Sequence, residues 1–198
     1  EKLPALFASE EELRAWRTRH GRHVVERADL RDIDGQGCFL GIDSGSTTTK
    51  IVLMDDSNRV VLTHYGSNHG DPIEAARTGL NAIGQQLKQA GISITIAGTA
   101  VTGYGEDLIK AAFGLDEGVV ETVAHFRAAQ TFDPDVSFIL DIGGQDMKAI
   151  FIAEKTISDI QINEACSSGC GSFMETLARS LNFTIDEFAQ LACDSREP

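Results

Sequence analysis

The chain is short of basic residues and of long apolar runs, and each shortage excludes a class of protein. Its 17 lysines and arginines are outnumbered by 30 aspartates and glutamates, which gives a formal net charge of −13. Proteins that bind the backbone of a nucleic acid carry clustered basic residues, so we expect no nucleic-acid partner. No apolar run approaches the length of a membrane span, and no signal-peptide pattern opens the chain. We therefore expect a cytoplasmic piece of a longer protein with no membrane partner.

Cysteine is also scarce, with only Cys38, Cys166, Cys170 and Cys193 in the chain. Their spacing fits neither the disulfide framework of a secreted protein nor a paired C-x-x-C zinc site, which favours a reducing compartment. Cys38 lies in an apolar run and Cys193 lies on a predicted helix, so we expect both to be small core residues. Cys166 and Cys170 differ because glycine and serine surround them.

The Walker A and dinucleotide-binding loops are absent too, but another phosphate-binding pattern is present. An apolar strand ends at Asp43, passes through glycine and hydroxyl residues, and resumes after Lys50. This predicts a β-hairpin in which Gly45 lets backbone N–H groups approach an anion and Ser46, Thr47 and Thr48 offer hydroxyl donors. Taken alone, the pattern is equally consistent with a tight turn, and Lys50 with a solvated surface residue.

The same scheme recurs at 136–152, which makes the phosphate interpretation much more specific. An apolar strand ends at Asp141, a turn follows at Gly143 and Gly144, and a second apolar strand begins at about position 147. Two such hairpins could clamp one nucleotide between them. The sequence therefore predicts a nucleotide site built from two similar hairpins.

The remaining pattern alternates helices and strands. A glycine-rich turn after the 92–97 strand presents Thr102 and Gly103, which could contact a nucleotide or, in the case of Thr102, simply cap the turn. Apolar spacing and capping residues predict helices over 10–19, 72–90, 105–113, 122–130 and 170–181 and after Thr184, and strands over 38–43, 50–55, 60–65, 92–97, 138–141, 147–153 and 155–162.

Four stretches, 41–50, 102–105, 141–148 and 163–173, together resemble the BadF/BadG/BcrA/BcrD-type ATPase family, which includes activators of 2-hydroxyacyl-CoA dehydratases. The residues before Gly37 look like the lead-in to the second activase module of large multidomain activase-related proteins. The resemblance implies an α/β, actin-like ATPase fold of the ribonuclease H-like kind. It divides the chain into a lead-in (1–36), a complete first subdomain (37–135) and the first part of a second subdomain (136–198). The adenosine-binding glycine pair and a second cluster cysteine are expected beyond Pro198.

The resemblance also implies ATP, Mg²⁺ and a 4Fe–4S cluster as cofactors. Asp43 and Asp141 would hold Mg²⁺ through water, and Gln145 or Asp146 would orient the attacking water. Cys166 would ligate a cluster shared across a two-fold axis, where helix N-termini favour the anionic cluster. The smaller activators have threonine or a similar residue at the position of Cys170, so its function stays open. The phosphates would be cradled by the first turn (45–48), Lys50 and the second turn (143–145).

The expected function is an ATP-dependent activator that transfers an electron at low potential to a 2-hydroxyacyl-CoA dehydratase or related reductase. The activator would be a homodimer, or a pair of modules in one polypeptide, that shares the cluster. Two alternatives remain. A sugar or acid kinase would share both hairpins but transfer phosphate to an added substrate, and a non-redox nucleotide-binding module would bind ATP without iron.

Overall fold

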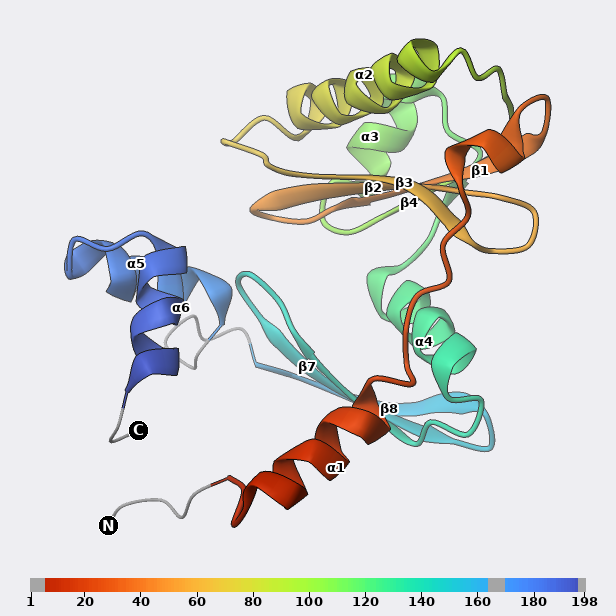
Figure 1. The fold of residues 1–198 in the computed structure, drawn as a ribbon. Helices are drawn as coiled ribbons and strands as arrows, with labels where there is room; N and C mark the ends of the chain where they lie inside the picture. The colour runs from red at the N-terminus through yellow and green to blue at the C-terminus, as the bar shows by residue number, and fades with distance from the viewer. Residues whose placement is uncertain (1–5, 164–169, 196–198) are drawn as a thin grey trace.

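The computed structural model describes residues 6–163 and 170–195 as two β-sheets with helices around them (Figure 1). The five-stranded sheet has the order β3-β2-β1-β4-β5, and the three-stranded sheet has the order β6-β7-β8. In chain order the elements are α1 (Glu10–His20), the 3₁₀ helix η1 (Leu30–Ile33), β1 (Gly37–Ser44), β2 (Thr48–Met54), β3 (Val60–Ser67), α2 (Pro72–Ala90), β4 (Thr95–Thr102), α3 (Glu106–Phe113), β5 (Glu117–Gly118), α4 (Glu121–Phe132), β6 (Phe138–Ile142), β7 (Met147–Ala153), β8 (Thr156–Asn163), α5 (Gly171–Ser180) and α6 (Ile185–Asp194).

The first sheet places the end of β1 beside the end of β4. β1 pairs antiparallel with β2, with Asp43 opposite Lys50, and it pairs parallel with β4, with Asp43 beside Thr102. A loop at the carboxyl end of β4 therefore lies next to the β1–β2 turn. The α/β class and the hairpin at 43–50, both predicted from the sequence, are confirmed.

Helix α2 begins and ends as its sequence predicts. The Asp71 side chain accepts a hydrogen bond from the Glu74 N–H, and Gly91 ends the helix in the left-handed conformation. The helix approaches the sheet closely at Gly79, where a Cβ atom would lie 2.6 Å from side-chain atoms of His64 and Ile51. Helices α2 and α3 cover the same face of the first sheet (Figure 1). The core beneath them consists of Ile33, Cys38, Ile42, Ile51, Leu53, Val61, Ala76, Ile83, Val101 and Ile109.

The strand predicted over 92–97 lies further along the chain, at β4. Hydrogen bonds hold the segment before it to the lead-in, since Ser93 N–H donates to the Asp34 carboxylate and the Ser93 carbonyl accepts from the Gly35 N–H. The strand continues through Gly98 and does not end there. A Cβ atom at this position would lie 3.2 Å from the Phe39 ring, so the glycine leaves room for that side chain. The sequence also missed β5 and η1, which are two and four residues long.

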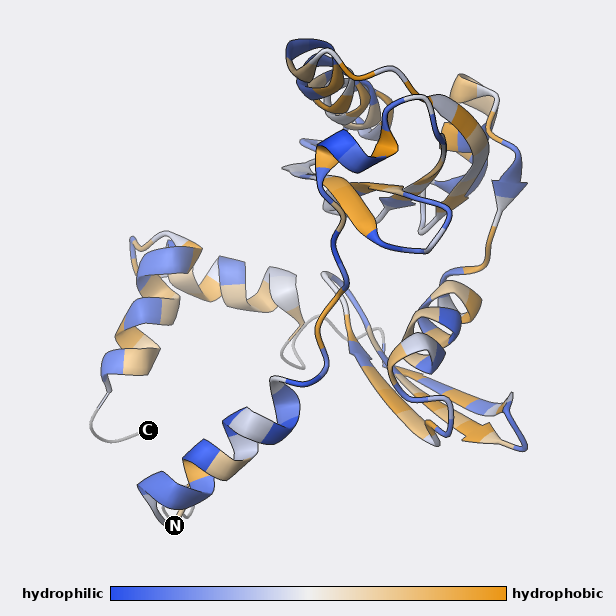
Figure 2. Cartoon of the chain, turned by 45° about the vertical axis from the view of Figure 1, so that its right-hand side comes forward, coloured by the Kyte–Doolittle hydropathy of each residue, from blue (hydrophilic) through white to orange (hydrophobic). Residues whose placement is uncertain are grey.

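The second sheet repeats the hairpin arrangement. β6 pairs antiparallel with β7, with Asp141 opposite Lys148 and Ile142 opposite Met147. Helix α4 lies between the two sheets (Figure 1), and its Phe126 is buried, as is Ile150 of β7. Hydrophobic residues recur along the strands of both sheets, whereas α1 is mostly hydrophilic (Figure 2).

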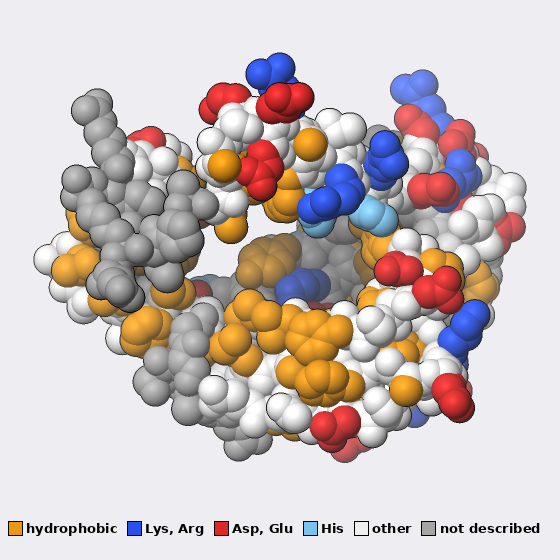
Figure 3. Space-filling model, turned by 90° about the horizontal axis from the view of Figure 1, so that it is seen from below, with side chains coloured by type: hydrophobic (Ala, Val, Ile, Leu, Met, Phe, Trp, Pro, Cys, Tyr) orange, Lys and Arg blue, Asp and Glu red, His pale blue; other side chains and the backbone are white. Residues whose placement is uncertain are grey.

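Several hydrophobic side chains stay outside the core. Phe138, Leu140 and Ile142 alternate along β6 and are each about half exposed. Hydrophobic side chains also gather on the face of the molecule seen from below (Figure 3). Cys38 is fully buried, as predicted, but the prediction of a core position for Cys193 is wrong: this thiol is exposed on α6, a helix with no buried residue. Within 6–163 and 170–195, no helix combines the length and apolar character that crossing a bilayer requires.

Candidate functional site

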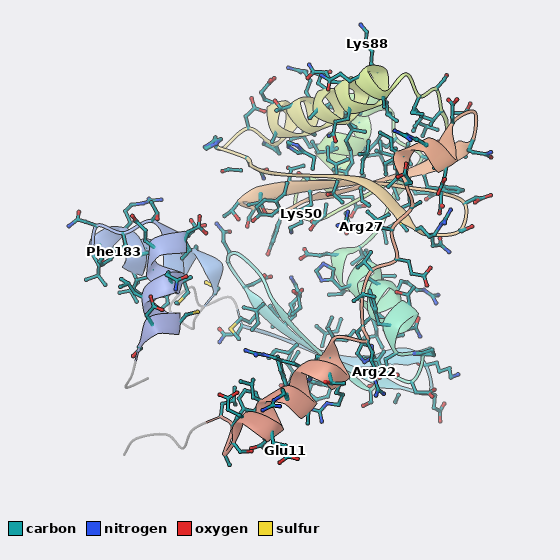
Figure 4. All side chains as sticks on the ribbon, viewed as in Figure 1. Glu11, Arg22, Arg27, Lys50, Lys88 and Phe183 are labelled. Carbon is teal, nitrogen blue, oxygen red and sulfur yellow. The ribbon has the colours of Figure 1, made fainter. Side chains whose placement is uncertain are left out.

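A cavity of about 200 Å³ lies between the two hairpin turns. It brings together carboxylates, glycines, hydroxyls and one lysine from both hairpins, with further side chains from α4 and the β4–α3 loop. Lys50 projects from the first sheet on the side that faces the second (Figure 4). The cavity is lined by Asp43, Gly45, Ser46, Thr47, Thr48, Lys50, Tyr104, Glu121, His125, Asp141, Ile142, Gly143, Gly144 and Asp146.

The first turn is fastened by Asn68, a buried residue just after β3. Its side-chain N–H donates to the Gly45 carbonyl at 2.7 Å, and its side-chain oxygen accepts from the Thr49 hydroxyl at 2.6 Å. The Gly45 N–H also donates to the Thr48 carbonyl at 2.9 Å, which closes the turn. Because the turn is held from behind, its hydroxyl groups face the cavity on a fixed backbone. No local sequence pattern marks Asn68, which lies 19 residues from Thr49 in the chain.

The second turn contacts both the first turn and the start of α5. A Cβ atom at Gly144 would lie 2.8 Å from the Thr47 hydroxyl oxygen, so glycine is required for this approach. The N–H groups of Gly171 and Ser172 donate to the Gly143 and Gly144 carbonyls at 3.1 and 2.8 Å. The second turn therefore lies between the first turn and helix α5.

Each hairpin carries an aspartate opposite a lysine, seven positions further along the chain. The Lys50 ammonium lies 2.8 Å from the Asp43 carboxylate. The Lys148 ammonium lies 3.9 Å from the Asp141 carboxylate. This matched placement explains why the two stretches look alike in sequence.

Lys148 is almost completely buried and is surrounded by carboxylates. Its ammonium lies 2.8 Å from Asp146 and 3.3 Å from Glu121. Burial by itself lowers the pKa of Lys148, but the hydrogen bonds and charges of Asp146 and Glu121 outweigh it, so the pKa is raised above its ordinary value. The Asp146 charge likewise raises the pKa of Tyr104, whose hydroxyl donates to that carboxylate at 3.4 Å. Asp146 is thus held by two donors.

Helix α4 adds two residues that the sequence reading missed, Glu121 and His125. They are four positions apart, so they share one face of the helix, and that face is turned to the second hairpin. His125 Nδ1 lies 2.8 Å from an Asp141 carboxylate oxygen. One ligand atom each of Glu121, His125 and Asp141 lies within 4.8 Å of the others, close enough to hold a metal ion. The spacing Glu-x-x-x-His just before the second hairpin was the available signal.

The predicted site residues take different positions relative to the cavity. Asp43, Asp141, Asp146 and Lys50 line the cavity, together with the first turn (45–48) and with Gly143 and Gly144 of the second turn. Thr102 and Gly103 lie behind the first turn: the Thr102 hydroxyl donates to the Val119 carbonyl at 2.7 Å, and Gly103 packs on the Ser44 carbonyl. Gln145 is exposed and does not line the cavity. Cys166 lies outside the described residues.

Comparison with known proteins gives a consistent picture. A sequence model of the BadF/BadG/BcrA/BcrD ATPase family matches residues 40–197. The chain is 30% identical over 159 residues to the (R)-2-hydroxyglutaryl-CoA dehydratase activating ATPase of Acidaminococcus fermentans, covering 79% of this chain and 58% of that protein. It is 35% identical over 156 residues to the activator of lactoyl-CoA dehydratase of Anaerotignum propionicum, covering 77% and 57%. The chain thus spans less than two thirds of the length of either relative.

A solved structure shares the arrangement of elements. It is the activator of the 2-hydroxyisocaproyl-CoA dehydratase from Clostridium difficile with bound ADPNP. The TM-score is 0.65 at 23% identity, and the match covers 80% of this chain and 57% of that one. At this identity the likeness concerns the fold.

Proposed function

The chain belongs to the BadF/BadG/BcrA/BcrD ATPase family and has an actin-like ATPase fold, and on that premise we propose that it is the ATP-binding part of an activator of an acyl-CoA dehydratase or related reductase. The observation that carries the proposal is the cavity between two hairpin turns, each with an aspartate at the end of its first strand. Nucleotide phosphates are bound by glycine-rich turns, hydroxyls and a cation in one place, and this cavity is lined by glycines of both turns, by hydroxyl residues and by Lys50.

In this proposal, the phosphates lie between the turns at 45–48 and 143–145, and Lys50 neutralises part of their charge. Asp43 and Asp141 would hold Mg²⁺ through water. The fit is good because Mg²⁺ prefers oxygen ligands and both carboxylates line the same small cavity. Mg²⁺, when bound, would neutralise charge that develops on the phosphates during hydrolysis. Thr102 and Gly103 would contribute by supporting the first turn from behind.

The activator role draws on the relatives, whose names identify them as activators of acyl-CoA dehydratases. We propose that the complete protein uses ATP hydrolysis to pass an electron to such an enzyme, in the cytoplasm. A 4Fe–4S cluster would supply the electron, with Cys166 as its ligand in this chain. The cluster would be shared between two subunits or two modules. The subdomains at 37–135 and 136–198 would move against each other as the nucleotide is hydrolysed.

Anaerobic reconstitution of the complete protein tests this function. Wild type should bind iron and hydrolyse Mg·ATP, and adding the dehydratase should draw electrons from it. Cys166→Ala should lose the iron and the electron transfer while keeping Mg·ATP binding. The exposed Cys193 supplies the matched control, since Cys193→Ala should keep all three properties. Transfer of phosphate to an added sugar or acid, with no iron bound, would contradict the proposal and indicate a kinase.

A further inference from the structure

Asp146 and Gln145 of the second turn and His125 of α4 are candidates for orienting an attacking water, and their contacts and exposure distinguish among them. Asp146 accepts from Lys148 at 2.8 Å and from Tyr104 at 3.4 Å, both on the same carboxylate oxygen. Gln145 is exposed and does not line the cavity. His125 lines the cavity and approaches Asp141 with only one of its two ring nitrogens.

The contact with Asp141 fixes which nitrogen of His125 carries the hydrogen. An ionised carboxylate can only accept a hydrogen bond, so Nδ1, 2.8 Å from the Asp141 oxygen, must be the donor. In a neutral imidazole this leaves Nε2 without a hydrogen and able to accept. Among residues 6–163 and 170–195, none makes a hydrogen bond to Nε2. His125 thus lines the cavity, and its contact with Asp141 leaves Nε2 as the ring nitrogen that has no hydrogen-bond partner within those residues.

We propose that His125 is the residue that orients the attacking water during ATP hydrolysis, with Nε2 accepting a hydrogen bond from that water. This inference rests on the proposed nucleotide site. The γ-phosphate would lie between the turns, and α4 would hold the imidazole on the cavity wall across from it. Asp141 would then serve two groups through its carboxylate, the water shell of Mg²⁺ and the Nδ1–H of His125.

Hydrolysis of ATP at this site needs no strong base to take a proton from the attacking water. A bond forms between the water oxygen and the γ-phosphorus while the bond from that phosphorus to the bridging oxygen breaks, and its electron pair stays on ADP. Phosphoryl transfer passes through a loose, metaphosphate-like transition state, so positioning of the water contributes more than removal of its proton. Both water hydrogens leave with the phosphate as dihydrogen phosphate. His125 thus contributes orientation and ends the step unchanged.

Two substitutions distinguish the role of Nδ1 from the role of Nε2. In His125→Asn the amide N–H₂ can take the place of Nδ1 and keep the hydrogen bond to Asp141, but nothing replaces Nε2. In His125→Gln the longer side chain can place its amide carbonyl near the Nε2 position. The variants are compared in the complete protein by single-turnover hydrolysis of Mg·ATP and by calorimetric measurement of the Kd for Mg·ATP.

We expect His125→Asn to lower the hydrolysis rate by about 100-fold, the loss that misplacement of a reacting group causes, and His125→Gln to lower it by less than about tenfold. The Kd should change by less than about threefold in both, because ground-state binding is not affected. His23→Ala, at an exposed histidine in the lead-in, is the control and should match wild type. Wild-type rates in His125→Asn, or equal losses in both variants, would overturn the water-orienting role. A wild-type protein that neither binds nor hydrolyses ATP would instead contradict the nucleotide site itself.

Discussion

Asp141 and Lys148 are direct partners across β6 and β7, yet the lysine does not form its closest contact with that aspartate. Its ammonium lies 3.9 Å from Asp141 but 2.8 Å from Asp146 in the turn between the two strands. In the first hairpin the equivalent lysine, Lys50, lies 2.8 Å from Asp43. Lys148 therefore stabilises the turn, which leaves Asp141 to His125 and to the cavity.

The two aspartates should be essential for hydrolysis. Asp43→Asn and Asp141→Asn should each lower the rate of ATP hydrolysis by about 100-fold to 1000-fold in the complete protein, since each removes a charge that would hold the metal. Steady-state phosphate release measures the effect, and thermal unfolding should show an intact fold. Asp56→Asn, at an exposed position in the β2–β3 turn, is the control. Unchanged rates of ATP hydrolysis in both variants would contradict the assignment of Asp43 and Asp141 as the residues that hold the metal.

Lys148 should be a major contributor to stability. Lys148→Met should lower the free energy of unfolding by about 3–5 kcal/mol, because it leaves the buried Asp146 carboxylate without its cation. The double variant Asp146→Asn with Lys148→Met should lose much less than the sum of the single losses. Urea unfolding measures the free energy of unfolding of Lys148→Met, of Asp146→Asn and of the double variant. Lys155→Met breaks an exposed pair with Asp135 and should cost no more than about 1 kcal/mol.

The raised pKa of Lys148 gives the same pair a pH dependence. The folded protein holds the proton of the Lys148 ammonium more tightly than the unfolded chain does. The contribution of Lys148 to the free energy of unfolding is therefore complete at neutral pH. It should fall as the pH rises through the ordinary lysine value of 10.5 and above. The difference in stability between wild type and Lys148→Met should therefore shrink in alkaline urea titrations. A constant difference would show that Lys148 acts through packing alone.

Gly103 should be required by the backbone. Its φ of +91° is unfavourable for other residues, and a Cβ atom would lie 2.5 Å from the Ser44 carbonyl oxygen. Gly103→Ala should lower the free energy of unfolding by about 2–4 kcal/mol, the sum of the strained conformation and the contact. Gly70→Ala is the matched control, since Gly70 has a φ of +83° with nothing within 4 Å and should pay only the conformational part. Equal losses would show that the Ser44 contact relaxes.

The thiols should differ sharply in reactivity. Cys193 is exposed, whereas Cys38 is buried, and burial, followed by the charges of Asp55 and Asp56, raises the pKa of Cys38. At pH 8 an alkylating reagent should modify Cys193 at least about 100-fold faster than Cys38, which must wait for local opening of the core. Mass spectrometry of the peptides identifies each site, and both should react equally in denaturant. Similar rates in the native protein would contradict the burial of Cys38.

The sequence predicted the elements whose signals are local. The caps of α1 and α2, with Ser9 and Asp71, and the strand–turn–strand pattern at each hairpin all lie within a few neighbouring residues. The strand at β4 was displaced because its limits depend on the lead-in, which holds Ser93 from almost 60 residues away in the chain. The alternating pattern at 92–97 gives no indication of the contact between Ser93 and the lead-in.

The site residues differ in the same way, between those with a local sequence signal and those that depend on distant partners. Both turns and both strand-end aspartates could be found because each is a short, repeated pattern. Asn68 could not be assigned, because it acts through partners on another element, and the Glu-x-x-x-His spacing of Glu121 and His125 does not by itself show that they face the second hairpin. Cys193 was misplaced for a related reason: an apolar neighbour on a helix predicts burial only when another element covers that face, and α6 has no buried residue.

The seven-residue interval from aspartate to lysine also limits how the two turns can change in length. Side chains alternate between the faces of a sheet, so one inserted or deleted residue would carry every later side chain of β2 or β7 to the opposite face. Lys50 would then leave the cavity, and Lys148 would leave its carboxylates. A substitution in either turn changes one side chain, whereas a single-residue insertion or deletion would disrupt the cavity and the core together.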